Sequence, residues 1–286
     1  MTAPAPGPAS GPIVARSAAD LRAAVSAWRR DGARIGFVPT MGALHDGHLM
    51  LADAARRAGA DRILFSIFVN PTQFGPNEDF SRYPRREVED LAKLASIGAD
   101  LAYLPGVSEI YPDGFAFSIV PSGPIVADLE AAVRPGHFAG VATVVAKLLI
   151  QAAPDLAAFG EKDFQQLQVV RRLVRDLDLT CEILPVPTVR DQDGLALSSR
   201  NAYLAPAQLA VARRLNRILA EIAADPSLLP AGPDRLRDAG FDGVDYLVLR
   251  DAETLADPAP GRPRRLIAAV RLGGTRLLDN LPVAAS

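Results

Sequence analysis

The chain has 286 residues, 49% of them hydrophobic, and a formal net charge of −2. This length and apolar content suffice for one large or two modest globular domains. Basic residues are scattered along the sequence, so we expect no nucleic-acid partner. The longest apolar stretch, residues 140–153, is interrupted by Lys147 and is too short to cross a bilayer, so we expect no membrane partner.

Residues 1–12 are rich in Ala, Pro and Gly and lack the basic start and apolar centre of a signal peptide. We expect a flexible tail and a cytoplasmic protein. The single cysteine, Cys181, lies in an apolar run and is expected to be a small buried strand residue. A disulfide within the chain is excluded.

From residue 34 to residue 189 the sequence alternates between strand-like and helix-like apolar patterns. The expected strands are residues 34–38, 62–69, 100–104, 115–120, 156–159 and 182–189, and the expected helices are residues 44–55, 87–97, 141–151 and 164–176. This alternation predicts an α/β fold with a doubly wound parallel sheet. Ligands of such sheets bind at the carboxyl ends of the strands.

The composition changes after about Val189. A long helix over residues 206–224 is followed by a stretch broken by Pro and Gly, a strand at 244–249, and a hairpin-like pair at 265–271 and 275–278. These patterns predict a smaller α+β domain over residues 189–286, after a larger domain over residues 13–188.

Two of the three histidines, His45 and His48, follow the first expected strand. The apolar pattern begins a helix there, so both imidazoles share one face of its first turn. Free backbone N–H groups and the helix dipole favour negative charge at that end, and two imidazole donors suit a polyphosphate.

Two other interpretations of these histidines remain open. They can be ordinary surface residues, or they can bind a catalytic zinc ion together with His137. The sequence contains no His-Glu-x-x-His pattern, so the zinc interpretation is the weaker one and no protein metal site is predicted.

Further polar segments follow other expected strands, and the strand ends of such a sheet converge. Asn70 and Gln73 follow the second strand, and Gly160-Glu161-Lys162-Asp163 and Ser198-Ser199-Arg200 come later. Taken alone, the first of these two later segments is more often a solvated turn than a phosphate site, and the second is more often a helix cap. Together a lysine, two hydroxyls, an arginine and two histidines suit a triphosphate. The amides of Gln73 and Gln166 suit a small polar substrate, although either can be a surface residue.

Six motifs in order resemble the pantothenate synthetase (pantoate–β-alanine ligase) family. They are Pro-Thr-Met-Gly-Ala-Leu-His-Asp-Gly-His from Pro39, Phe-Val-Asn-Pro-Thr-Gln-Phe-Gly from Phe68, Tyr83-Pro84-Arg85, Arg134-Pro135-Gly136-His137-Phe138, Phe-Gly-Glu-Lys-Asp from Phe159, and Ser-Ser-Arg-Asn from Ser198. The His-x-Gly-His element alone would indicate only the wider nucleotidyltransferase superfamily. The chain departs from the family pattern at Leu197, Phe164 and Ala131.

The resemblance implies a Rossmann-like domain with the active site, a smaller carboxyl-terminal lid domain and a homodimer. It also implies that ATP and Mg²⁺ activate pantoate as pantoyl adenylate with release of pyrophosphate. β-Alanine then displaces AMP to give pantothenate. The Mg²⁺ ion would be bound mainly through the phosphates of ATP.

Site residues follow from the same resemblance. The catalytic groups would be His45, His48, Lys162 and Arg200. ATP would contact Met41, His45, His48, Gly160, Lys162, Asp163, Val189, Leu197, Ser198, Ser199 and Arg200. Gln73 and Gln166 would bind pantoate, and the site would be shaped by Asn70, Tyr83, Arg134 and His137.

Independently of the family, a carboxylate that attacks an α-phosphorus needs cations and donors that strengthen as charge develops on oxygen. Lys162, His48 and Arg200 supply such groups. The alternative functions are another nucleotidyltransferase, a zinc-dependent hydrolase and a catalytically silent nucleotide-binding protein.

Overall fold

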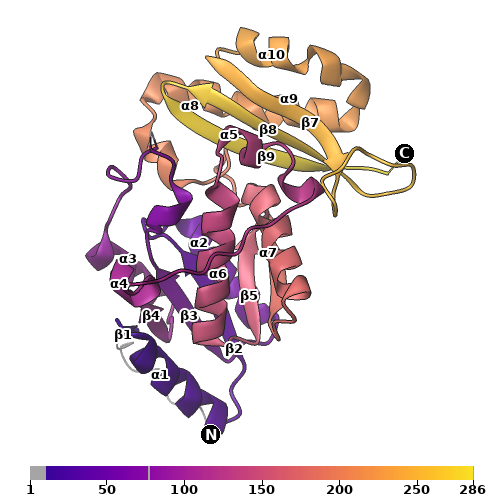
Figure 1. The fold of residues 1–286 in the computed structure, drawn as a ribbon. Helices are drawn as coiled ribbons and strands as arrows, with labels where there is room; N and C mark the ends of the chain where they lie inside the picture. The colour runs from indigo at the N-terminus through magenta and orange to yellow at the C-terminus, as the bar shows by residue number, and fades with distance from the viewer. Residues whose placement is uncertain (1–10, 77, 286) are drawn as a thin grey trace, which may run out of the picture.

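The computed structural model describes residues 11–76 and 78–285. Most of the expected tail, residues 1–10, lies outside the described residues. The chain forms a large unit around a parallel sheet, residues 13–186, and a small unit around an antiparallel sheet, residues 206–283 (Figure 1).

The large unit contains a six-stranded sheet in which every strand pair is parallel. Its strands are β1 (Ile13–Ala15), β2 (Ile35–Thr40), β3 (Arg62–Ile67), β4 (Leu101–Tyr103), β5 (Leu156–Gly160) and β6 (Glu182–Val186). The spatial order is β1-β4-β3-β2-β5-β6. The chain proceeds from β2 to β3 and β4 in one direction and then restarts on the other side of β2, so the order reverses between β2 and β5.

Helices cover both faces of this sheet because successive strand residues point to opposite sides. Phe37 and Leu64 pack in one core with α1 (Ala18–Arg30), α6 (His137–Ala152) and α7 (Phe164–Asp176). Val38 and Phe65 pack in the other core with α2 (Asp46–Arg57) and α3 (Glu87–Ser96). The predicted doubly wound α/β fold is confirmed.

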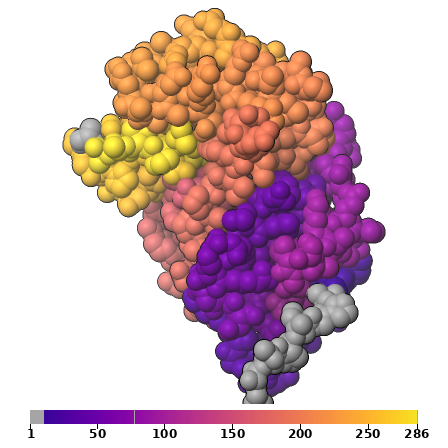
Figure 2. All heavy atoms as spheres, turned by 180° about the vertical axis from the view of Figure 1, so that it is seen from behind, coloured from indigo at the N-terminus to yellow at the C-terminus, as the bar shows by residue number. Residues whose placement is uncertain are grey.

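The small unit packs helices on one face of an antiparallel sheet of order β7-β8-β9. The strands are β7 (Gly243–Asp251), β8 (Arg264–Leu272) and β9 (Thr275–Val283), and the helices are α8 (Pro206–Ala212), α9 (Arg214–Ala224) and α10 (Gly232–Asp238). Ile267 on the opposite face is buried in a core of the large unit, and Tyr246 packs against that core. The small unit, orange and yellow, is thus seated directly on the large one (Figure 2).

Short helical elements complete the fold. They are α4 (Val107–Ile110), α5 (Glu130–Val133), and the 3-10 turns η1 (Pro71–Gln73), η2 (Pro124–Val126), η3 (Glu161–Asp163), η4 (Ser199–Tyr203) and η5 (Pro226–Ala231). Several of these turns lie directly after strands of the large unit, where the predicted polar segments occur.

The predicted strand over residues 115–120 was wrong. This run passes across α6 (Figure 1), and no strand of the described chain pairs with it. The Phe115 N–H donates to the Pro112 carbonyl oxygen and the Ile119 N–H to Thr143 Oγ1, each at 2.9 Å. A turn and a side chain therefore hold this segment in place of a strand ladder.

Other differences from the sequence-based prediction are smaller. β1 and α1 were not expected. The single helix expected over residues 206–224 is two helices. Arg213 lies between them and forms ion pairs with Asp191 and Asp193. Cys181 is buried as expected, one residue before β6.

Gly140 allows α6 to approach η1 closely. A Cβ atom at this position would lie 2.4 Å from the Thr72 carbonyl oxygen and 2.7 Å from the Gln73 nitrogen. Both contacts are shorter than any real Cβ contact and involve backbone, which cannot rotate away. The missing side chain therefore sets the position of Gln73 relative to α6.

We predict that Gly140→Ala destabilises the protein by about 1–3 kcal/mol, the usual cost of overpacking. Gly106→Ala is the matched control, because its added Cβ has no atom within 4 Å. Denaturant unfolding of both variants measures the difference. Equal stability of Gly140→Ala and the wild type would mean that α6 and η1 can separate freely.

Candidate functional site

A cavity of about 650 Å³ lies between the carboxyl edge of the parallel sheet and the small unit. The reversal of strand order between β2 and β5 opens onto it, as expected for an open α/β sheet. The structure places every predicted site residue in its wall: Met41, His45, His48, Asn70, Gln73, Tyr83, Arg134, His137, Gly160, Lys162, Asp163, Gln166, Val189, Leu197, Ser198, Ser199 and Arg200.

The turn between β2 and α2 is held by a buried carboxylate. Asp90 of α3 accepts the backbone N–H groups of Ala43 at 2.9 Å and Leu44 at 2.7 Å. Ala43 has a φ of 50°, a conformation that costs energy for a residue with a side chain. The two hydrogen bonds offset that cost, so Asp90 fixes the point at which α2 begins.

His45 and His48 lie together at the start of α2. The His45 backbone N–H donates to Nδ1 of His48 at 3.3 Å, which leaves the His48 proton on Nε2 as a donor. The two ring centroids are 4.0 Å apart. A Cβ atom at Gly47 would lie 2.9 Å from the His45 ring, so the glycine between the histidines makes room for this packing.

Both imidazoles are neutral at pH 7. Burial, followed by the charge of Lys162, lowers the pKa of His45 to about 4. Burial and the neighbouring His45 lower the pKa of His48 to about 3. The pair therefore offers N–H donors without fixed positive charge, and a bound polyanion would favour their protonation.

Lys162 supplies the fixed charge beside the histidines. It follows β5 in η3, and its Nζ lies 3.4 Å from Oδ1 of Asp163. Burial alone would raise the pKa of Asp163, but the Lys162 ammonium outweighs it and holds that pKa below its usual range. The predicted lysine and the two histidines thus form one cluster at the ends of β2 and β5.

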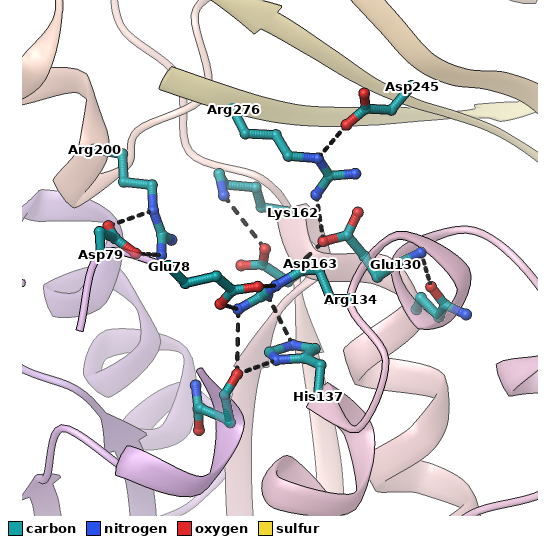
Figure 3. Close-up of polar contacts among 12 residues, drawn as sticks. Glu78, Asp79, Glu130, Arg134, His137, Lys162, Asp163, Arg200, Asp245 and Arg276 are labelled. Atoms are coloured by element: carbon teal, nitrogen blue, oxygen red, sulfur yellow. Dashed lines mark hydrogen bonds and ion pairs between the residues drawn. The ribbon is translucent and has the colours of Figure 1, made fainter. Parts of the chain in front are cut away.

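Arg200 reaches the same cavity from the segment that leads into the small unit. Its Nε and Nη2 donate to Asp79 at 3.1 and 3.0 Å, which leaves Nη1 as a donor (Figure 3). Burial would raise the pKa of Asp79, but Arg200 outweighs it and lowers that pKa. Ser199 Oγ lies 3.3 Å from the Tyr83 hydroxyl.

Arg134 and His137 support the wall near Gln73. Arg134 forms a bidentate pair with Glu78, and its Nη1 lies 3.0 Å from Nε2 of His137. His137 Nδ1 donates to the Gln73 carbonyl oxygen at 2.8 Å, and burial lowers the pKa of His137 to about 4. Both ring nitrogens of His137 are therefore engaged within the protein.

This arrangement counts against the zinc interpretation. Zinc would require His137 to give up one of its two contacts. Within residues 11–76 and 78–285, no group of three His, Cys, Asp or Glu side chains is placed to hold a metal ion.

Gln73 is a buried amide in the wall of the cavity. Asn70 Nδ2 donates to Gln73 Oε1 at 3.1 Å, and Asn70 also holds the Gly140 carbonyl oxygen at 3.2 Å. Gln73 Nε2 lies 3.1 Å from the weak acceptor Sδ of Met41. This N–H group is thus poorly satisfied and is available to a ligand oxygen.

Four acidic residues that hold the site together were missed from the sequence: Glu78, Asp79, Asp90 and Glu130. Glu130 accepts an Arg276 N–H at 2.6 Å (Figure 3) and also the Tyr246 hydroxyl at 2.6 Å, and so joins the two units. The only sequence signal was the large excess of arginine over lysine, which favours bidentate carboxylate partners.

Comparisons with known proteins identify the family to which the chain is similar. The family described as pantoate-beta-alanine ligase matches residues 13–282. The pantothenate synthetase of Paramagnetospirillum magneticum is 55% identical over 280 residues, covering 94% of this chain and 97% of that protein. That of Rhodospirillum rubrum is 53% identical over 279 residues, covering 94% and 98%.

Solved structures show the same likeness. The pantothenate synthetase of Thermus thermophilus superposes with a TM-score of 0.87 at 48% identity, covering 94% of this chain and 98% of that one. The Francisella tularensis pantoate-beta-alanine ligase, solved with beta-gamma ATP and beta-alanine, has a TM-score of 0.83 at 36% identity, with coverage of 95% and 97%. Among the described residues, no helix is long and apolar enough to traverse a membrane.

The three lowered histidine pKa values predict a pH-dependent stability. The histidines of the unfolded chain titrate near about pH 6.5, whereas in the folded protein they titrate near pH 4 or 3. Between these values the unfolded state binds more protons, so the free energy of unfolding falls as the pH drops from about 6.5 to 4.

His48→Gln isolates one contribution. From pH 6.5 to pH 5 the wild type should lose about 1–2 kcal/mol more stability than this variant, because one fewer group titrates. Urea unfolding at several pH values measures the slopes. Identical slopes would contradict the burial of a neutral His48.

Proposed function

Because the chain belongs to the pantoate-beta-alanine ligase family, we propose that its cavity holds ATP at the ends of β2 and β5 and pantoate beside Gln73. The enzyme condenses pantoate with β-alanine to pantothenate in an ATP-dependent reaction, through pantoyl adenylate, and releases AMP and pyrophosphate. One observation supports the assignment of the phosphate site: the wall of a single cavity contains His45, His48, Lys162 and Arg200.

In the first step a pantoate carboxylate oxygen attacks the α-phosphorus of ATP, and the bond to the β-phosphate oxygen breaks. Negative charge increases on the departing pyrophosphate and on the α-phosphate oxygens. Lys162 offers a point charge, His48 an N–H donor and Arg200 the free Nη1 edge of its guanidinium, and such preorganised groups are worth most in a closed site. No protein nucleophile is required.

The remaining ATP contacts follow from the positions in the wall. We propose that Met41, Ser198 and Ser199 complete the phosphate site together with His45, and that Gly160, Asp163, Val189 and Leu197 contact the nucleoside. Mg²⁺ usually keeps several waters and binds through substrate phosphates. The acidic side chains near the phosphate site are paired with Lys162, Arg200 and Arg134, which fits an ion bound mainly through ATP.

Pantoate is proposed to bind through neutral amides. Gln73 and Gln166 orient its hydroxyl and carboxylate oxygens without forming an ion pair that would reduce the nucleophilicity of the carboxylate. Asn70, Tyr83, Arg134 and His137 shape this part of the wall. In the second step the β-alanine amine attacks the acyl carbon and AMP leaves.

We further propose a homodimer, supported by the segment at residues 115–120. Phe117 is 86% exposed and Val120 is 71% exposed in an extended run with no strand beside it in the described chain. An exposed extended segment of this kind pairs readily with a second copy.

We also propose that residues 189–286 act as a lid that excludes water from the adenylate. The enzyme is proposed to work in the cytoplasm, where ATP is available.

The first experiment tests adenylation alone. Enzyme, pantoate, ATP and Mg²⁺ should exchange labelled pyrophosphate into ATP without β-alanine, because the groups assigned to ATP and pantoate do not depend on the amine. Omitting pantoate is the control. Absence of exchange until β-alanine is added would contradict a free-standing adenylate.

A second prediction concerns Gln73→Leu. Removing a buried hydrogen-bonding partner costs about 1–3 kcal/mol, so pantoate affinity should fall roughly ten- to a hundredfold while ATP affinity changes little. Gln168→Leu is the matched control, since Gln168 is another buried glutamine that does not line the cavity. Calorimetric titration of each ligand decides the outcome, and equal losses for ATP and pantoate would mean that Gln73 does not contact pantoate.

A further inference from the structure

The turn that carries Lys162 is held by a side chain of the small unit. Asn280 of β9 is 1% exposed, and its Nδ2 donates to the carbonyl oxygens of Glu161 at 2.9 Å and Lys162 at 2.8 Å. These are two successive backbone acceptors in η3. One amide group therefore holds the backbone carbonyl groups immediately before and after the Lys162 α-carbon.

The other end of the Asn280 amide is fixed as well. Its Oδ1 accepts an N–H from Nε of Arg265 at 2.6 Å, and Arg265 Nη2 donates to Glu161 Oε2 at 2.9 Å. The Arg265 guanidinium also lies over the Phe164 ring, 4.4 Å from its centroid, just past the turn. Asn280 is thus locked in one orientation, because both of its donor hydrogens and its oxygen are used.

The residue beside Asn280 holds the opposite side of the phosphate site. Asp279 is 2% exposed and forms a bidentate pair with Arg190 at 2.7 and 2.8 Å. Arg190 pairs through an isolated β-bridge with Ala196, immediately before the segment Leu197-Ser198-Ser199-Arg200. Consecutive residues of β9 therefore reach both segments that supply the proposed phosphate-binding groups: Asn280 bonds directly to the Lys162 turn, and Asp279 acts on the Ser198–Arg200 segment through Arg190.

We propose that Asn280 is a positioning residue for adenylation: from the small unit it fixes the η3 turn so that the Lys162 ammonium is aimed at the phosphates. Asn280 touches no substrate itself, and it acts through Lys162. This inference rests on the proposed function of the cavity and adds that the lysine is placed by both units together.

An amide is the side chain this position requires. An aspartate of the same shape would present carboxylate oxygens to two carbonyl oxygens and could not donate to either. An alanine would leave two buried carbonyl oxygens without a donor. Either change frees the turn, and displacement of a catalytic group by about 1 Å can cost roughly a hundredfold in rate.

The test is a double-mutant cycle on pantoate-dependent pyrophosphate exchange, with the full-length enzyme and saturating ATP and pantoate. Asn280→Ala should lower the exchange kcat roughly ten- to a hundredfold and leave the pantoate KM within about twofold. Lys162→Ala should lower it about 10²–10³-fold. In the Lys162→Ala background, Asn280→Ala should have almost no further effect.

Arg250→Met is the matched control for loss of a bond between the units. Arg250 Nη2 donates to Asp128 Oδ2 at 2.6 Å, and neither residue lines the cavity. This variant should lose thermal stability and keep the exchange kcat within about twofold. If Arg250→Met loses as much activity as Asn280→Ala, general docking of the units explains the effect and the proposal is overturned.

Asn280→Asp serves as the second variant if the alanine variant does not fold. It keeps an acceptor for Arg265 and loses both donors, so the same loss of kcat is expected. The proposal is overturned if Asn280→Ala lowers the exchange kcat by the same factor in the Lys162→Ala background as in the wild type. It is also overturned if Asn280→Asp keeps the exchange kcat of the wild type. If the wild type itself shows no pantoate-dependent exchange, the proposed function fails instead.

Discussion

The reversal of strand order between β2 and β5 is the constraint on which the rest of the site depends. On either side of it a strand ends and a helix begins, so α2 and α7 both direct their amino-terminal segments toward one cavity. His45 and His48 come from one of these segments and Lys162 from the other. The cluster forms because the two strands are neighbours in the sheet, although about 115 residues separate the segments in the chain.

Carboxylates then determine which donors remain for a ligand. Glu78 pairs with Arg134, Asp79 accepts from Nε and Nη2 of Arg200, and Asp90 holds the turn before α2. Paired arginines are fixed in position and contribute little net charge, whereas the neutral histidines and Lys162 stay available. The site is therefore prepared for a polyphosphate without accumulating a large unpaired positive charge in the empty cavity.

The alternation of apolar runs was enough to predict the parallel sheet, because buried strands and amphipathic helices differ in period. The site residues could be named because each follows a strand or lies in a recognisable motif. Residues 115–120 show where local pattern fails: their alternation is strand-like, but a strand exists only where a partner lies beside it. The acidic residues Glu78, Asp79 and Glu130 could not be found, since their roles depend on arginines distant in sequence.

The relation between the two units was equally invisible from the sequence, and it changes how a lid can work. Asn280 is bonded to the η3 turn, Arg276 to Glu130, and Ile267 is buried in the core of the large unit. A small unit that swung away as a whole would break all three contacts and leave buried carbonyl oxygens and charges without partners. Opening the cavity therefore costs less free energy when only segments without such contacts move. The lid proposed for residues 189–286 would therefore close by movement of those of its segments that lack such contacts, while β9 stays in place as a wall of the site.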